Sequence, residues 1–261
     1  MPELENVLMA TADHIATITL NRPEQRNPLS SAMLRDLISA FTWCRDDDSV
    51  RVVVLTGAGD RAFSSGADLS SFEAGVAEEV RHRERHSFIE LFLLMNGLGK
   101  PIVGRINGHA LAGGMGLAGS CDLLVAVDTA TFATPEINVG VWPMMIQAVL
   151  ARNLPRKVLL EMAMLGDRWT AIQMQSVGFV NKVVARELLD ATVDEVAGKL
   201  AKKSAAVMRL GKDSFYRQQD MDFDKALEYL YGELLKVVST EDAKEGVLAF
   251  FEKREPSFKG K

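Results

Sequence analysis

Two features of the stretch from residue 100 to residue 136 have residue types and spacing that could do chemistry. The glycine-rich run Gly113-Gly114-Met115-Gly116 is expected to open a helix, where the first backbone N–H groups have no partner within the helix and the helix dipole is positive. Glu136 follows a proline and lies among apolar and small residues, where partial burial would adapt a carboxylate to carry a proton. The stretch therefore combines backbone donors with an acid–base group.

Two apolar runs are expected to position these groups. The β-branched run over residues 101–106 ends at the turn dipeptide Asn107-Gly108, and a second run spans residues 123–127. Both runs are typical of strands, so the stretch is predicted to form a strand, a loop, a short helix and a second strand. Residues 110–127 have about the length of a membrane span, but the segment contains Asp122 and its glycine run would weaken a lone helix, so we expect no membrane segment.

The residues before this stretch predict further elements of the same kind. Residues 15–20 alternate between apolar and other residues, which predicts a strand, and the apolar run 52–55 is typical of a strand that is buried on both faces. Ser30 can cap a helix whose apolar residues repeat at helical spacing. Residues 73–86 are polar and charged, which favours a solvated helix over a mobile lid.

The pattern changes near residue 186. Strands and helices alternate up to that point, and the remaining chain has helical spacing almost throughout. The sequence therefore predicts an α/β core over residues 1–185 and a helical region over residues 186–261.

Composition limits the classes of function. The chain has 261 residues, 48% hydrophobic and 25% charged, which fits one large globular domain or one domain with an appended piece. Its net charge of −5 gives no general attraction to nucleic acid or to an anionic membrane. The two cysteines, Cys44 and Cys121, are too few for a disulfide scaffold, and no Cys/His grouping has the spacing of a metal site. The first residues lack the pattern of a signal peptide, so we expect a cytoplasmic protein.

Five strings in a fixed order resemble the enoyl-CoA hydratase/isomerase family, the crotonase superfamily. The resemblance extends from about residue 15 to residue 254, nearly the whole chain. The strings are NRPEQRN (Asn21–Asn27), VVLTGAGDRAFSSGADL (Val53–Leu69), KPIVGRINGHALAGG (Lys100–Gly114), CDLLVA (Cys121–Ala126) and PE (Pro135-Glu136).

The resemblance implies a fold and an assembly. Crotonase-like proteins stack β-β-α units into a right-handed spiral and carry a C-terminal helical region that trimerises, so a homotrimer or a homohexamer is expected. The resemblance also implies an acyl-CoA thioester as substrate. Coenzyme A is then part of the substrate, and no separate cofactor is expected.

The resemblance also assigns roles to residues of this sequence. The backbone N–H groups of Ala67 and Gly113 would hold the thioester oxygen, and Glu136 would transfer the proton. Such donors stabilise developing enolate charge, typically by about 3–4 kcal/mol each. The expected substrate-binding residues are Arg26, Ser64, Gly66, Asp68, Leu69, Gly114, Gly116 and Trp142.

At one position the sequence departs from the family pattern. Hydratases of the family usually carry a second glutamate where this sequence has Gly116. One carboxylate is sufficient to move a proton between C2 and C4, so we expect isomerisation of a 3-enoyl-CoA to a 2-enoyl-CoA. Hydration by Glu136 alone and a silent acyl-CoA-binding paralogue remain alternatives. Bulky residues around Trp142 are expected to line the acyl pocket or to belong to the core.

The same glycines also fit the pattern of a different class of protein. Residues 114–119 fit G-x-G-x-x-G, the dinucleotide-binding fingerprint. That fingerprint should directly follow the first strand, whereas here a loop from Asn107 intervenes. We therefore favour the acyl-CoA enzyme.

Overall fold

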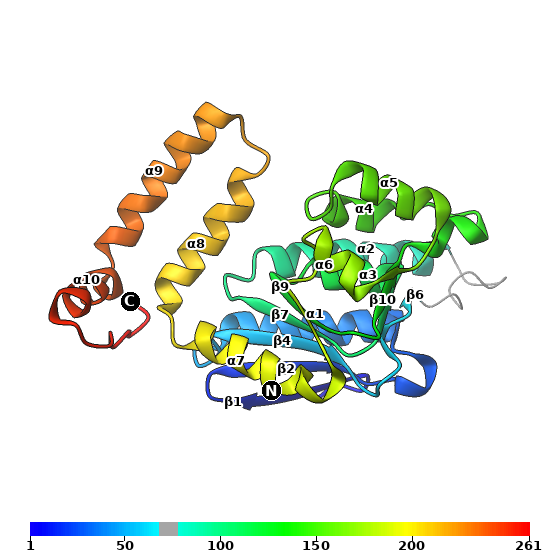
Figure 1. The fold of residues 1–261 in the computed structure, drawn as a ribbon, viewed down its shortest axis with the longest axis horizontal. Coiled ribbons are helices and arrows are strands. Elements are labelled where there is room, and N and C mark those ends of the chain that lie inside the picture. Colours follow the sequence, from blue (N-terminus) through cyan, green and yellow to red (C-terminus); the bar gives the residue numbers. More distant parts are fainter. Residues whose placement is uncertain (68–77) are drawn as a thin grey trace.

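A six-stranded sheet forms the centre of the molecule (Figure 1). The computed structural model describes residues 1–67 and 78–261, with only the backbone described for residues 78–85. The first two strands are antiparallel and all later neighbours are parallel. In sheet order the strands are β1 (Val7–Ala12), β2 (Ile15–Leu20), β4 (Val52–Gly57), β7 (Ile102–Ile106), β9 (Leu123–Val127) and β12 (Lys182–Val184).

The strands predicted from apolar patterns are confirmed. The alternating run is β2, in which every second residue is buried, and the continuous run is β4, which is buried along its whole length. Helix α1 (Ser31–Asp46) begins where predicted, because the Ser30 hydroxyl accepts a hydrogen bond from the Met33 N–H at 3.3 Å.

A second, smaller sheet receives one short strand after each of β4, β7 and β9. Its order is β11 (Trp169–Thr170), β10 (Thr131–Ala133), β8 (His109–Leu111) and β5 (Ala62–Ser64), and the last three are parallel to one another. A two-stranded ladder pairs β3 (Pro28–Leu29) with β6 (Gly66–Ala67). Strands β7 and β8 followed by helix α3 (Gly113–Gly119) form one β-β-α unit, and the same order recurs along the chain. The expected spiral of β-β-α units is therefore confirmed.

The helices up to α7 pack around the sheets, and the last three helices extend away from them. The remaining helices of the first part are α2 (Glu78–Asn96), α4 (Met144–Leu150), α5 (Arg156–Leu165) and α6 (Ala171–Ser176), with short 3-10 turns η1 (Pro23–Gln25), η3 (Pro135–Val139) and η4 (Arg186–Leu188). Helix α7 (Leu189–Ala201) packs on β4, β7 and β9 of the main sheet. Beyond it, α8 (Ala205–Gln218), α9 (Phe223–Ser239) and α10 (Glu241–Glu252) project away from the core (Figure 1). The chain after residue 186 is thus helical, as expected, and the division into two regions stays a prediction.

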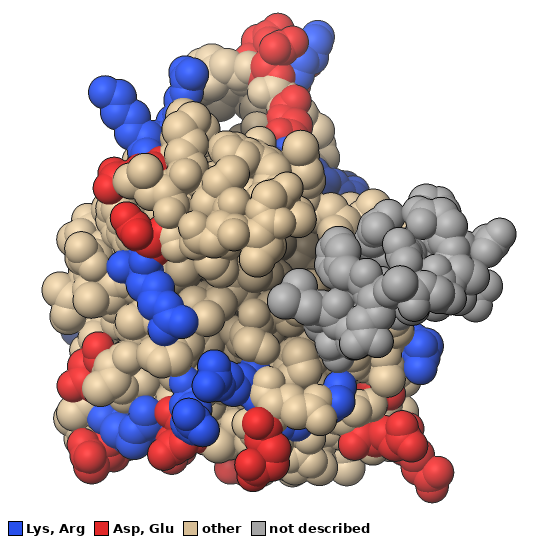
Figure 2. Space-filling view, turned by 90° about the vertical axis from the view of Figure 1, so that its right-hand side faces the viewer, with Lys and Arg blue, Asp and Glu red and all other residues tan. Residues whose placement is uncertain are grey.

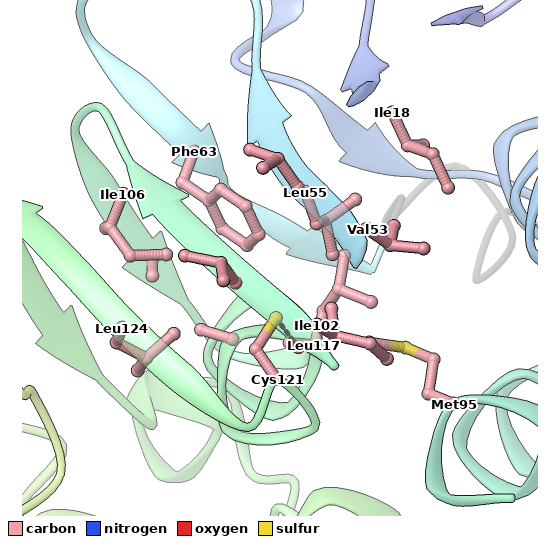
Figure 3. Close-up of a cluster of buried hydrophobic side chains, with 14 of the residues drawn as sticks. Ile18, Val53, Leu55, Phe63, Met95, Ile102, Ile106, Leu117, Cys121 and Leu124 are labelled. Atoms are coloured by element: carbon pink, nitrogen blue, oxygen red, sulfur yellow. Dashed lines mark hydrogen bonds between the residues drawn. The ribbon is translucent and has the colours of Figure 1, made fainter. Parts of the chain in front are cut away.

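The core lies between the sheets and α3 (Figure 3). Phe63, Ile106 and Leu117 are fully buried there, and the Cys121 thiol lies 3.7 Å from the Leu117 carbonyl oxygen. Every residue of α3 is buried. The helix that begins at the glycine-rich run is therefore fixed by packing on all sides.

A polar cluster attaches α8 to this core. The Lys212 ammonium group donates to the Asp122 carboxylate at 2.7 Å and to the Lys100 carbonyl oxygen at 2.9 Å. The same carboxylate accepts hydrogen bonds from the Tyr216 hydroxyl and the Ile102 N–H, each at 2.7 Å. Both charges of the Lys212–Asp122 pair are therefore compensated although the lysine side chain is only 6% exposed.

None of the helices in the described ranges is long and apolar enough to cross a membrane. Within the same ranges, no group of three or more His, Cys, Asp or Glu residues could hold a metal ion. Cys44 and Cys121 are free and buried.

Candidate active site

The predicted catalytic residues follow the carboxyl ends of three neighbouring parallel strands. Ala67 comes shortly after β5, Gly113 after β8, and Glu136 after β10, and these strands are adjacent in the order β10-β8-β5. Parallel strands end at the same edge of a sheet, so the three segments share one edge. The topology therefore brings together what the sequence separates by up to 69 residues (136 − 67).

Close backbone contacts join the segments of Ala67 and Gly113. A Cβ placed on Gly113 would lie 3.4 Å from the Ala67 backbone nitrogen, and one placed on Gly66 would lie 3.0 Å from the Gly113 nitrogen. A Cβ on Gly114 would lie only 2.5 Å from the Ser64 carbonyl oxygen. Glycine at positions 66 and 114 is thus required for the strand end and the helix start to meet.

The backbone is strained where the two segments meet. Gly66 has φ +95°, and Ala112, directly before the helix, has φ +50° and ψ −127°. A residue with a Cβ rarely adopts this conformation, which costs of order 1–3 kcal/mol and is found mainly at functional sites. The Ala112 N–H donates to the Ala133 carbonyl oxygen at 2.9 Å, which ties the turn to the end of β10.

Hydrogen bonds hold the loop of Arg26 against the same edge. The Ser65 N–H donates to the Arg26 carbonyl oxygen at 2.9 Å, and the Ser64 hydroxyl donates to the Asn27 carbonyl oxygen at 2.8 Å. The buried Asn27 amide donates in turn to the Ala62 carbonyl oxygen at 3.0 Å. The predicted binding residues Arg26, Ser64 and Gly66 therefore lie together.

Glu136 has the environment of a proton carrier. Its Oε2 atom is buried, and together with Thr134 Oγ1 it is one of two buried side-chain oxygens without a hydrogen-bond partner in the described part of the chain. Burial raises the pKa of the Glu136 carboxyl group, and a hydrogen bond with its own backbone opposes that shift. A carboxyl group whose pKa lies nearer to neutral exchanges a proton with carbon acids more readily.

An isoleucine fills the space beside Gly116, which the sequence did not indicate. A Cβ on Gly116 would lie 2.3 Å from Cγ2 and 2.8 Å from Cβ of Ile146, and 3.3 Å from the Phe92 ring. Ile146 belongs to α4 and is buried. A side chain at position 116 would therefore collide with a rigid, β-branched neighbour.

Trp142, the remaining predicted binding residue that the structure describes, lies just after the Glu136 segment. Trp142 is half-buried, and its indole N–H donates to the Gln147 side chain at 2.6 Å. The preceding Val141 N–H donates to the Glu136 carbonyl oxygen at 3.0 Å, so Trp142 follows the acid–base segment closely. Asp68 and Leu69 lie outside the described residues.

Known proteins match this chain over nearly its full length. The family model for enoyl-CoA hydratase/isomerase matches residues 10–261. The rat enoyl-CoA hydratase domain-containing protein 3, mitochondrial, is 35% identical over 257 residues, which cover 98% of this chain and 85% of that protein. Crotonyl-CoA hydratase of Syntrophomonas wolfei is 32% identical over 258 residues, which cover 97% of this chain and 98% of that protein.

Solved structures match equally well. The human enoyl coenzyme A hydratase domain-containing protein 3 superposes with a TM-score of 0.94 at 32% identity, covering 97% of this chain and 100% of that one. An enoyl-CoA hydratase of Mycobacterium smegmatis gives a TM-score of 0.93 at 35% identity, with coverage of 97% and 99%. The fold is the crotonase fold, and the chain belongs to the enoyl-CoA hydratase/isomerase family of enzymes.

Proposed function

We propose that this enzyme moves the double bond of a 3-enoyl-CoA to position 2, with Glu136 as its single proton carrier. The observation that carries the proposal is the contact between Gly116 and Ile146. Where hydratases of the family usually have a second carboxylate, this chain has a glycine whose side-chain space is filled by an apolar residue. An enzyme with one carboxylate can shuttle a proton but has lost half of the apparatus that positions and activates water.

The proposed reaction needs only groups at the edge of the small sheet. The thioester oxygen would accept hydrogen bonds from the Ala67 and Gly113 N–H groups, which would stabilise the enolate. The Glu136 carboxylate would remove a proton from C2, the electron pair would move into the thioester, and the resulting acid would return the proton to C4. The double bond then lies between C2 and C3, and Glu136 is a carboxylate again.

The names of relatives favour a second candidate, hydration of a 2-enoyl-CoA. The proteins of Syntrophomonas wolfei and Clostridium acetobutylicum that match this chain are named crotonyl-CoA hydratase and short-chain-enoyl-CoA hydratase. Hydration here would require Glu136 alone to activate the water, because Ile146 offers no polar atom beside Gly116.

We also propose that the protein is a homotrimer, alone or paired as a homohexamer. Large apolar side chains are exposed on the projecting helices, among them Phe223 (80% exposed), Phe250 (78%) and Phe251 (75%). Exposed apolar area of this kind usually marks an interface. Light scattering after gel filtration measures the state, and a monomer at micromolar concentration would refute it. The cytoplasmic setting expected from the sequence likewise stays a prediction.

Absorbance of the conjugated thioester tests the activity. Purified protein is mixed with 3-enoyl-CoA and 2-enoyl-CoA substrates of several chain lengths, with Glu136→Gln as the control. Absorbance should grow from 3-enoyl-CoA, and Glu136→Gln should reduce the rate by about 10²–10⁴-fold. Decay from 2-enoyl-CoA with a 3-hydroxyacyl-CoA product would instead establish the hydratase. Tight binding of the CoA ester without turnover of either substrate would leave a silent binding protein.

A further inference from the structure

Two phenylalanines of α2 connect two glycine positions of α3. Gly113 and Gly116 are three positions apart, which places them on the same face of the helix and about 4.5 Å apart along its axis. A Cβ on Gly113 would lie 3.3 Å from the Phe88 ring, and one on Gly116 would lie 3.3 Å from the Phe92 ring. The two rings are neighbours, with centroids 6.1 Å apart. One apolar wall therefore runs from the proposed oxyanion hole to position 116.

Helix α4 closes this wall at its far end. Cγ2 of Ile146 would lie 2.3 Å from a Cβ on Gly116. Side-chain atoms of Val149 and Leu150 would each lie 3.2 Å from a Cβ on Gly119. The three α4 residues have the i, i+3, i+4 spacing of one helix face, so packing against two glycines of α3 holds α4 in place. Ile146 is 5% exposed, and a β-branched residue in a helix has one strongly preferred rotamer, so the barrier beside position 116 is rigid.

The side chains that meet this space are apolar. Besides Phe88, Phe92 and Ile146, Cδ1 of Leu29 would lie 3.5 Å from a Cβ on Gly113. Figure 2 views the molecule from the side where α4 and α5 lie in Figure 1, and a broad area in the middle of this face is uncharged. A charged group at the far end of an acyl chain would find no partner on this wall, and burying it unpaired is costly. The wall therefore fits a hydrocarbon chain.

The position of Ile146 along α3 sets a length for that chain. A thioester held by the N–H groups of Ala67 and Gly113 would lie at the start of the helix, and Ile146 meets the helix about 4.5 Å further on. Three C–C bonds of about 1.5 Å each have the same total length. An acyl chain that follows the wall therefore reaches Ile146 near its fourth carbon.

We propose that Ile146 and Phe92 end the acyl site and restrict the enzyme to uncharged acyl groups of about four carbons. The position of the thioester rests on the proposed function, but the limit on chain length applies equally to isomerisation and to hydration. Ile146 is then a specificity-determining residue and takes no part in the proton transfer. In an open apolar site, each added CH₂ group would strengthen binding about fourfold. Here the carbons beyond the fourth would overlap the Ile146 side chain.

Calorimetric titration with saturated acyl-CoA esters of four, six, eight and ten carbons measures the length profile without turnover. The wild type should bind the four-carbon ester most tightly and the eight-carbon ester about 10–200-fold more weakly. In Ile146→Ala, the ratio of eight-carbon to four-carbon affinity should rise by about tenfold or more. Phe92→Leu changes a half-buried residue and should move the ratio in the same direction, so it replaces Ile146→Ala if that variant does not fold.

Val149→Ala is the matched control. It removes a contact of the same kind between α4 and α3, one turn further from Gly113, and should leave the affinity ratio unchanged. Affinity that rises with each added carbon in the wild type would overturn the proposal, as would an equal change of the ratio in Ile146→Ala and Val149→Ala. Turnover of 3-enoyl-CoA is measured separately. A preference for the four-carbon ester without turnover would therefore refute the proposed reaction and leave the limit on chain length intact.

Discussion

The edge of the small sheet and the projecting C-terminal helices are built in opposite ways. At the sheet edge, backbone atoms of three strands meet so closely that Gly66 and Gly114 cannot carry a side chain, and α3 is buried throughout. Helices α8 to α10 instead expose large apolar residues and reach the core through the polar cluster around Asp122. The geometry of the candidate site is therefore fixed by packing within one chain. The position of helices α8 to α10 depends instead on a few polar contacts and on the surface that covers their apolar faces.

Lys212→Met should give the largest loss of stability. The substitution leaves the Asp122 carboxylate without its cation, and breaking one partner of a buried ion pair costs about 3–5 kcal/mol. Chemical denaturation measures the free energy of unfolding. Lys202→Met, which removes an exposed lysine from the end of α7, is the matched control and should change it by less than about 0.5 kcal/mol.

The same variant sharpens the contrast between the two regions. Among the described residues, the Lys212 ammonium group forms hydrogen bonds with Met95, Lys100 and Asp122, away from the edge of the small sheet, so the folded fraction of Lys212→Met should keep most of its activity. An equal loss of stability in both lysine variants would show that the cluster does not hold α8.

Gly113→Ala should have the opposite profile, with a large effect on rate and a small one on stability. The new Cβ would lie 3.4 Å from the Ala67 nitrogen, in the space where the thioester oxygen is proposed to bind. Loss of this donor geometry should lower kcat by about 10²–10³-fold. Gly198→Ala is the control, because a Cβ there meets nothing within 4 Å and the helix should gain about 0.5–1 kcal/mol. Unchanged turnover in Gly113→Ala would refute the assigned oxyanion hole.

The sequence predicts the long strands of the main sheet accurately and the short strands of the small sheet poorly. Strands β2 and β9 were predicted with the bounds that the structure has, because long apolar runs in a buried sheet carry a clear pattern. Strands β5, β8 and β10 have three residues each, too few for any period to be visible. Strand β1 was not predicted either, since most of its residues are exposed and do not alternate.

For the site, the family resemblance supplied residues but not their surroundings. It identified Glu136 and the departure at Gly116, and the roles of these residues stay predictions. The contact with Ile146 joins positions 30 residues apart and has no signature in either segment. Such contacts are set by tertiary packing, which local patterns do not encode.

The contact between Gly116 and Ile146 predicts that substitutions at the two positions have non-additive effects on the free energy of unfolding. Gly116→Ala should cost about 1–3 kcal/mol because its Cβ would overlap the Ile146 side chain. The cost should be smaller in an Ile146→Ala background, which removes the Cγ2 atom, and denaturation of all four proteins gives the coupling energy. Additive effects would show that the two residues do not compete for the same space.

A related variant tests whether this contact separates isomerase from hydratase. Gly116→Glu combined with Ile146→Ala places a carboxylate in the space that Ile146 now fills. Hydration of 2-enoyl-CoA should then rise relative to isomerisation, measured by product analysis of the same reaction mixtures. If the ratio is unchanged, the missing carboxylate does not decide between the two reactions.

The smallest expected effect is a pH-dependent gain of stability in Glu136→Gln. Burial raises the folded-state pKa of Glu136 above its unfolded value, so this group favours the folded state below the unfolded pKa, and that contribution is lost as pH rises through the folded pKa. Glutamine resembles the protonated acid, so the variant should match the wild type near about pH 4 and exceed it at about pH 7.5. Denaturation across this range measures the difference. Glu245→Gln gives the contrasting case, because the Arg254 side chain lowers the pKa of Glu245 to about 2 and its removal should destabilise the protein at neutral pH. If the free energy of unfolding of Glu136→Gln has the same pH dependence as that of the wild type, the Glu136 carboxyl group is as well solvated in the folded protein as in the unfolded chain. Its pKa would then not be raised, and the residue would lack the property expected of a proton carrier.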